Sequence, residues 1–214
     1  MTRDWARWHE VYYDADGSSG RQRLRTVQLH IQAFLDAQPA GEIRIIDACA
    51  GQGRDLLPVL ADSPRREDAW ARMVELDSRN TAAARKTIEE IGLDRVEVVE
   101  ADAGCTDVYA GAVPADLVLM CGVFGHLSEA DIRSTVAGLL QLCARGATVI
   151  WTRGRGGGDL TPSIRQWFAD EGFSEQAFVS PGFYESAWSV GVHRLTASPQ
   201  PLSRGQRLFS FIRG

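Results

Sequence analysis

The chain has 214 residues, of which 44% are hydrophobic and 24% are charged, and it carries a formal net charge of −5. These proportions are typical of a globular protein with one sizeable core. The acidic balance argues against a general role on nucleic acid or on a membrane surface, because phosphate groups bind to basic faces.

The first forty residues predict a helical cover that precedes the main core. Trp5, Trp8 and Tyr12 recur at helical spacing. A second helical stripe consists of apolar residues, namely Leu24, Val27, Ile31, Phe34 and Leu35. Because the core of the sheet that follows does not need these segments, we expect them to lie over a ligand crevice. No apolar stretch has the character of a secretion signal or the length of a membrane span.

From Ile43 onward, strand-like and helix-like segments alternate. The expected strands cover residues 43–48, 69–76, 96–99, 116–120 and 147–152, and the expected helices cover 54–60, 78–91, 128–142 and 161–171. Gly92 is typical of a helix C-terminus, and the run from Ser128 to Asp131 resembles a capping box. Repeated strand–helix units of this length imply a parallel sheet with helices on both faces.

The end of the chain breaks this alternation. Residues 173–180 and 187–196 read as two strands with only a short loop between them, and such strands must run antiparallel. We therefore expect one α/β domain over residues 1–214, with a doubly wound, seven-stranded, mostly parallel sheet that ends in an antiparallel hairpin. Within it we expect an N-terminal helical cover (1–40), a cofactor-binding core (41–200) and a C-terminal tail (201–214).

The first strand ends in a glycine-rich turn, Asp47-Ala-Cys-Ala-Gly-Gln-Gly53, before a helical segment. Such a turn gathers backbone N–H groups and a helix N-terminus at one point, where a cofactor can be held. Glycine matters at Gly51 and Gly53 because a Cβ there would keep the backbone away from a ligand. Arg54, at the start of the expected helix, is a further candidate for cofactor contact.

With this turn and two later acidic positions, the chain resembles the class I S-adenosylmethionine-dependent methyltransferases over about residues 43–196. In that family an acidic residue after the second strand accepts hydrogen bonds from the ribose hydroxyls, and Asp77 fits this role. Another acidic residue follows the third strand near the adenine amino group, and Asp102 fits that role. The run from Met120 to Leu127 is similar to the loop that passes the reacting methyl group. Cys49 and Ala50 stand where the family often has glycine.

The resemblance implies S-adenosylmethionine as the cofactor and a Rossmann-like methyltransferase fold. Twelve residues are the expected cofactor contacts: Asp47, Ala48, Cys49, Ala50, Gly51, Gly53, Arg54, Asp77, Asp102, Ala103, Cys121 and Tyr12. Tyr12 is included because its hydroxyl can bind the carboxylate of the cofactor. Arg21, Arg23 and Arg25 are alternative partners for that carboxylate, although an arginine-rich helix start also fits a solvated face.

Methyl transfer needs alignment of the acceptor, and a base where the acceptor carries a proton. Of the four histidines, His126 is the leading candidate because its loop should border the methyl group, and His9 is the second. A packing or capping role for His126 is the alternative. His30 and His193 fall within an expected helix and an expected strand, so we interpret both as structural.

Aromatic residues supply the candidate acceptor contacts. Trp8 and Tyr13 belong to the N-terminal cover, and Phe183 and Tyr184 lie in the loop between the last two strands. Ring faces there suit a cationic cofactor or a planar acceptor, and ordinary packing is the competing interpretation.

These observations predict a cytoplasmic methyltransferase, monomeric or homodimeric, that acts on a small molecule, with no metal, nucleic acid or membrane partner. The four scattered cysteines indicate reduced thiols and no zinc site. We interpret the patch from Arg153 to Gly158 as a flexible loop in preference to a nucleic-acid contact. One alternative is a non-catalytic S-adenosylmethionine-binding or partner protein of the same fold. An NAD(P)-dependent oxidoreductase fits less well, because Leu56 replaces the third glycine of its turn.

Overall fold

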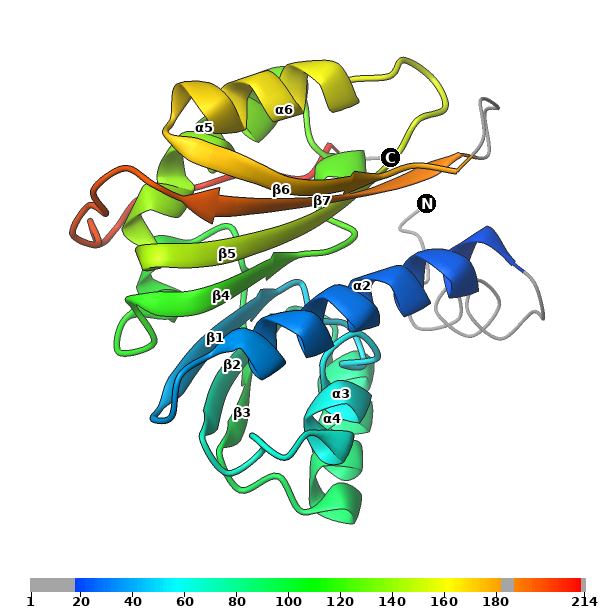
Figure 1. The fold of residues 1–214 in the computed structure, drawn as a ribbon, viewed down its shortest axis with the longest axis vertical. Helices are drawn as coiled ribbons and strands as arrows, with labels where there is room; N and C mark the ends of the chain where they lie inside the picture. The colour runs from blue at the N-terminus through cyan, green and yellow to red at the C-terminus, as the bar shows by residue number, and fades with distance from the viewer. Residues whose placement is uncertain (1–17, 182–186, 213–214) are drawn as a thin grey trace.

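The computed structural model describes residues 18–181 and 187–212 (Figure 1). Its centre is a seven-stranded sheet in the order β3-β2-β1-β4-β5-β7-β6. The strands are β1 (Ile43–Ala48), β2 (Ala69–Glu75), β3 (Val96–Glu100), β4 (Ala115–Met120), β5 (Cys143–Gly154), β6 (Phe173–Val179) and β7 (Trp188–Leu195).

The sheet is parallel from β3 to β5, and β7 runs antiparallel to both of its neighbours. The expected seven-stranded, mostly parallel sheet with a terminal hairpin is therefore confirmed. The carboxyl ends of β1 to β5 share one edge, which is the edge where open α/β sheets bind ligands.

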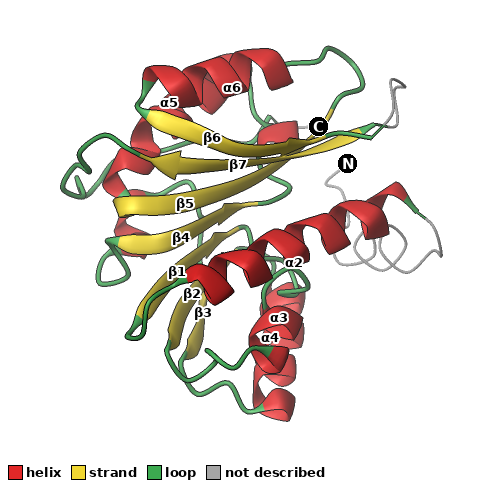
Figure 2. Ribbon diagram, viewed as in Figure 1, coloured by secondary structure: helices red, strands yellow, loops and turns green. Residues whose placement is uncertain are grey.

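The helices form two layers on the sheet (Figure 2). They are α2 (Ser19–Ala37), α3 (Leu57–Asp62), α4 (Ser78–Ile91), α5 (Glu129–Gly138) and α6 (Thr161–Asp170), with short 3₁₀ turns at 106–109, 124–126 and 139–141. Helices α2, α3 and α4 cover one face, and α5 and α6 cover the other. Among the described helices, none has the length and apolar character that a membrane crossing needs.

Helix α2 belongs to the core, which corrects the expectation that the sheet does not need this segment. Val27, Ile31 and Leu35 are almost fully buried in the cluster that includes residues of β1, α3 and β7. Each such side chain contributes about 1.5–3 kcal/mol when it leaves water. The sequence analysis correctly identified the apolar stripe, but the stripe packs in the core instead of lying over a ligand crevice.

Local signals fixed most element ends. Ser18 and Ser128 cap α2 and α5 by accepting backbone N–H bonds from Arg21 and Asp131. The bond from Asp131 to Ser128 is the first of the two bonds of the expected capping box, and the Asp131 carboxylate accepts the Ser128 hydroxyl. Gly92 ends α4 with a φ of 63°. The helix expected from Arg54 begins only at Leu57, because the turn continues through residues 54–56, and Pro58 suits its first turn.

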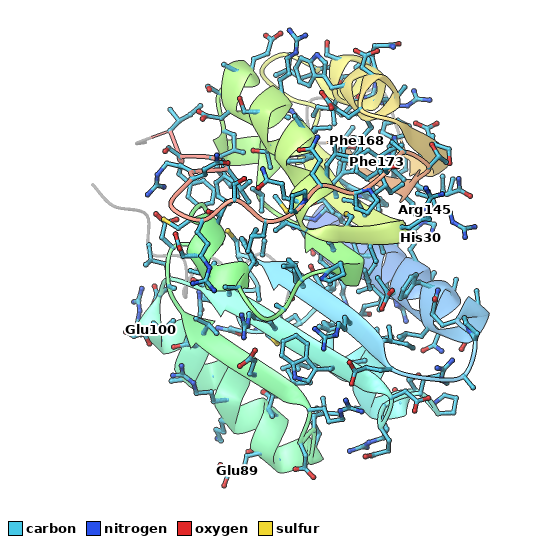
Figure 3. The ribbon with its side chains drawn as sticks, turned by 90° about the vertical axis from the view of Figure 1, so that its left-hand side faces the viewer. His30, Glu89, Glu100, Arg145, Phe168 and Phe173 are labelled. Carbon is cyan, nitrogen blue, oxygen red and sulfur yellow. The ribbon has the colours of Figure 1, made fainter. Side chains whose placement is uncertain are left out.

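The half of the sheet formed by β5, β7 and β6 carries a buried aromatic cluster. Phe168 of α6 meets Phe173 of β6 edge to face at 5.2 Å, and the two rings lie side by side in Figure 3. Trp151 and His193 stack on the same Phe168 ring, at 6.1 and 4.3 Å. This cluster holds α6 against the hairpin strands.

Candidate functional site

The turn after β1 is held open by three residues with positive φ: Cys49 (58°), Gly51 (56°) and Gly53 (75°). Its backbone is tied to β2, because the Ala50 N–H donates to the Val74 carbonyl at 3.0 Å and the Gly51 N–H donates to the Glu75 carboxylate at 2.9 Å. The reason expected for Gly53 is wrong. A Cβ there would meet Leu57 and Met73 side chains at 2.6 Å, so this glycine serves packing of the turn on the core.

Two acids at the end of β2 have different partners. The Glu75 carboxylate accepts the Gly51 N–H at 2.9 Å and the Asp77 N–H at 2.8 Å, so it lies against the glycine turn. The Asp77 carboxylate instead caps α4 through the Arg79 N–H at 2.9 Å and pairs with the Arg79 guanidinium at 2.7 Å, which lowers the pKa of Asp77. The structure thus brings Glu75, which the sequence analysis missed, against the glycine turn, whereas the Asp77 carboxylate, which was expected to accept from the ribose hydroxyls, bonds the start of α4.

Two further acids, Asp47 of β1 and Asp55 of the turn, belong to this region. Asp47 is 1% exposed, and its Oδ2 has no hydrogen-bond partner within the described residues. Burial raises the pKa of Asp47 well above its usual range, and the nearby Asp55 and Glu75 raise it further. Burial also raises the pKa of Asp55, which the sequence analysis missed as well, while Arg23 of α2 and the Cys121 thiol oppose that shift.

The two thiols of this region are held protonated. Burial raises the pKa of Cys49 and of Cys121 well above the usual range, and neighbouring carboxylates raise both further. Because the thiolate is the reactive form of cysteine, neither side chain is poised as a nucleophile.

The loop after β3 presents Asp102 at the same edge. Its Oδ1 accepts the Gly104 N–H at 2.8 Å, and its Oδ2 pairs with Arg207 of the C-terminal segment at 2.9 Å. Asp102 lies near enough to Cys49 to raise the pKa of that thiol. The turn after β1 and the loop after β3 therefore face the same region, as the sequence predicted.

The loop after β4 holds Cys121 and His126. The Gly122 N–H donates to Thr152 Oγ1 at 2.8 Å, and Arg153 donates to the Phe124 carbonyl, so β5 fixes the loop from one side. His126 ends the short 3₁₀ turn, is half-buried, and its ring meets Phe211 at 6.2 Å.

Several predicted site residues lie outside the described part of the chain. They are His9, Trp8, Tyr12, Tyr13, Phe183 and Tyr184. Arg54 is described, and it precedes α3 with its guanidinium on Gln52 and its carbonyl accepting from Gln28. Within residues 18–181 and 187–212, no group of His, Cys, Asp and Glu side chains is arranged to hold a metal ion.

The arrangement of acids at this edge suits a ligand that carries hydrogen-bond donors and a positive charge. Carboxylates from three strands converge on one edge, where they can accept hydrogen bonds from hydroxyl and amino groups and can balance a positive charge. Nucleosides and ammonium groups carry such donors.

Comparison with known proteins agrees with this geometry. Residues 7–156 match the model of a family described as "Putative methyltransferase". A relative in Escherichia coli strain K12, the uncharacterized protein YnbC, is 28% identical over 149 residues, which are 67% of this chain and 25% of YnbC. The chain thus spans about a quarter of the length of this curated relative.

Solved structures share the fold at low sequence identity. Magnesium protoporphyrin IX methyltransferase (ChlM) from Synechocystis PCC 6803, solved with bound S-adenosylmethionine, is 17% identical with a TM-score of 0.67, covering 91% of this chain and 92% of ChlM. An rRNA methylase from Streptococcus thermophilus is 12% identical with a TM-score of 0.55, covering 78% of this chain and 95% of the methylase. The expected methyltransferase fold is confirmed.

Proposed function

This chain belongs to that methyltransferase family, and from this premise we propose that it transfers the methyl group of S-adenosylmethionine to a small-molecule acceptor. The observation that carries the proposal is the convergence of Asp47, Glu75 and Asp102 on the edge beside the glycine turn. When bound, S-adenosylmethionine supplies an activated methyl group on a sulfonium, ready for in-line displacement.

The residues at this edge fit the cofactor. S-adenosylmethionine carries an α-ammonium and a sulfonium, and the orphaned Asp47 Oδ2 is a buried acceptor that lacks a donor. Burial and, to a smaller extent, the nearby Asp55 and Glu75 raise the pKa of Asp47, and a cation beside the carboxyl group would offset both effects.

Within the proposal, each acid binds a different part of the nucleoside. Glu75 accepts from the ribose hydroxyls, because each carboxylate oxygen keeps an acceptor site after its one bond to a backbone N–H, of Gly51 or of Asp77. Asp102 accepts from the adenine amino group, and Ala103 packs beside it. The backbone of residues 48–53, with Cys49, Ala50 and Gly51, lies along the methionine end, together with Cys121 from the next strand. Asp77, Arg54 and Tyr12 stay in the proposal as outer contacts of the same cofactor.

The acceptor then lies next to the loops after β4 and β5. His126 is proposed as the base that removes the acceptor's proton, with His9 as the second candidate. Trp8, Tyr13, Phe183 and Tyr184 are proposed to line the acceptor pocket. The acidic balance of the chain favours a small molecule over RNA, even though an rRNA methylase shares the fold. We further propose that the protein is cytoplasmic and works as a monomer or homodimer.

Titration calorimetry with S-adenosylmethionine, S-adenosylhomocysteine and NAD is the first test. We expect micromolar binding of the first two ligands and no binding of NAD. Release of S-adenosylhomocysteine is then measured over a panel of small acceptors and a bulk rRNA sample. Binding without turnover on any acceptor supports the non-catalytic alternative, and turnover on rRNA alone contradicts the small-molecule proposal.

His126→Gln tests the base. With an acceptor that must lose a proton, we expect a fall in kcat of about 100-fold at pH 7 and loss of the acidic limb of the pH profile. An unchanged profile would remove His126 from catalysis while leaving the methyltransferase proposal intact.

A further inference from the structure

The C-terminal segment, residues 199–212, turns back across the edge that carries the candidate site (Figure 1). It leaves β7, passes the 3₁₀ turn at 139–141, where the Gln200 N–H donates to the Leu140 carbonyl at 2.8 Å, and reaches the loop after β3. It ends beside the loop after β4, where the Ile212 N–H donates to the His126 carbonyl at 2.9 Å. This segment lies wholly beyond residues 7–156, the part that matches the family.

Backbone hydrogen bonds fix the segment to the loop after β3. The Thr106 N–H donates to the Gln206 carbonyl at 3.0 Å, and the Leu208 N–H donates to the Gly104 carbonyl at 2.7 Å. The approach is so close that a Cβ on Gly104 would lie 2.3 Å from the Phe209 carbonyl oxygen. Leu208 and Phe209 are buried at 5% and 1% exposure, so the segment is part of the folded core.

Arg207 lies between these anchors and faces Asp102. Its Nη1 donates to Asp102 Oδ2 at 2.9 Å and to the Phe209 carbonyl at 3.2 Å, and its Nη2 lies 3.4 Å from Cys105 Sγ. The second oxygen of Asp102 accepts the Gly104 N–H at 2.8 Å. The carboxylate is thus oriented from both sides, while each oxygen keeps an acceptor site for a further donor.

We propose that Arg207 is a positioning residue of the cofactor site, which holds the Asp102 carboxylate in the orientation that accepts the adenine amino group. This inference rests on the proposed function. It makes the C-terminal segment a working part of the site, although the segment lies 105 residues from Asp102 in the chain. Arg207 contacts no cofactor atom in this account and acts only through Asp102.

The test uses the full chain and the affinity for S-adenosylhomocysteine, measured by titration calorimetry. Arg207 is half-exposed, so Arg207→Met should fold, and we expect its Kd to rise about five-fold through loss of one charge-assisted hydrogen bond. Arg204→Met is the matched control, because Arg204 is an exposed arginine of the same segment and its removal changes the net charge equally. We expect its Kd to stay within about two-fold of the wild-type value.

Two readouts separate positioning from general stability. In the Asp102→Ala background, Arg207→Met should give no further rise in Kd. The analogue of S-adenosylhomocysteine with a purine base, which lacks the 6-amino group, should bind wild type and Arg207→Met equally well.

Other outcomes overturn the inference. An equal loss for both ligands means that Arg207 acts on the fold, and an unchanged or tighter Kd for S-adenosylhomocysteine means that it does not orient Asp102 for the ligand. Failure of the wild-type protein to bind S-adenosylhomocysteine would instead overturn the proposed function, and the two failures are therefore distinguishable.

Discussion

The glycine turn and the aromatic cluster each contain a buried polar atom that no described residue satisfies. In the turn it is Asp47 Oδ2, and in the cluster it is His193 Nε2. Asp47 is the penultimate residue of β1, at the edge proposed to bind the ligand, whereas His193 lies within β7, stacked on Phe168 at 4.3 Å. The same feature is therefore a candidate binding group in one region and a packing element in the other.

The electrostatics of the two regions are alike. Burial raises the pKa of Asp47 and lowers the pKa of His193 to about 4, so each side chain is favoured in its neutral form. The comparison teaches that a buried, unsatisfied polar atom is a sign of function when it lies at the edge where open α/β sheets bind ligands, and not when it lies within a packed strand. The imidazole of His193 already has partners within the protein, because Trp151 donates to Nδ1 at 3.1 Å and the Glu175 carboxylate lies 3.6 Å from Nε2.

The largest expected effect is the pH dependence of stability that His193 causes. In the unfolded chain His193 binds a proton once the pH falls below about 6.5. In the folded chain the pKa of His193 is about 4, so the proton binds only at lower pH. Stability is therefore lost as the pH falls through this window, by about 2–3 kcal/mol between pH 7.5 and pH 4.5. Urea unfolding of wild type and His193→Phe at both pH values measures it.

In His193→Phe the loss of stability caused by protonation of His193 disappears. The missing hydrogen bond from Trp151 costs about 1 kcal/mol of stability at every pH. Affinity for S-adenosylhomocysteine should stay unchanged, because His193 lies within β7, whereas the acids proposed to hold the cofactor lie at the ends of β1, β2 and β3. Parallel pH curves for the two proteins would show that His193 is not buried as a neutral group.

Asp47→Asn should have a smaller effect, of the opposite sign. Since the folded pKa of Asp47 is raised, the unfolded chain releases its proton at lower pH, and wild-type stability falls as the pH rises above about 4. The non-titrating variant avoids this penalty and should be about 1–2 kcal/mol more stable at pH 7.5, with the gain vanishing near pH 4.

The same substitution should weaken binding of S-adenosylmethionine by about ten-fold, since asparagine, unlike Asp47, cannot ionise when the cation of the ligand lies beside it. A variant that is more stable and binds S-adenosylmethionine as tightly as wild type would show that Asp47, like His193, is only a packing element. The contrast between the glycine turn and the aromatic cluster would then be wrong.

The smallest expected effect distinguishes the two acids after β2. Glu75→Gln should raise the Kd for S-adenosylhomocysteine about ten-fold, because an amide nitrogen replaces one acceptor. Asp77→Asn is the comparison variant, since asparagine is a good helix cap and the change removes the charge and the pair with Arg79. Because Asp77 is proposed only as an outer contact, we expect its Kd to rise by no more than about two-fold. The reverse pattern would restore the ribose contact to Asp77.

Much of the fold followed from local sequence. The alternating segments, the glycine turn, the Ser128 cap and the Gly92 stop each depend on the preferences of a few neighbouring residues, and the structure agrees with them. The terminal hairpin was also predictable, because a short loop permits only antiparallel pairing.

The site was predictable only in outline. Asp77 was the more obvious candidate for the ribose contact than Glu75, because it directly precedes a helical run. For the same reason its carboxylate caps the N-terminus of α4 by accepting the Arg79 N–H. Glu75 was visible as the last residue of a strand, but its bond to Gly51 depends on the spacing of β1 and β2. Nothing in the sequence linked the tail to Asp102.

The sequence by itself determined which segments become strands and helices, and that their carboxyl ends carry acids and glycines. Only the tertiary structure decided which acid turns toward the ligand edge, that α2 completes the core, and that Arg207 meets Asp102. Secondary structure depends on neighbours a few positions apart, whereas burial, pKa and ion pairing depend on which distant groups exclude water from one another.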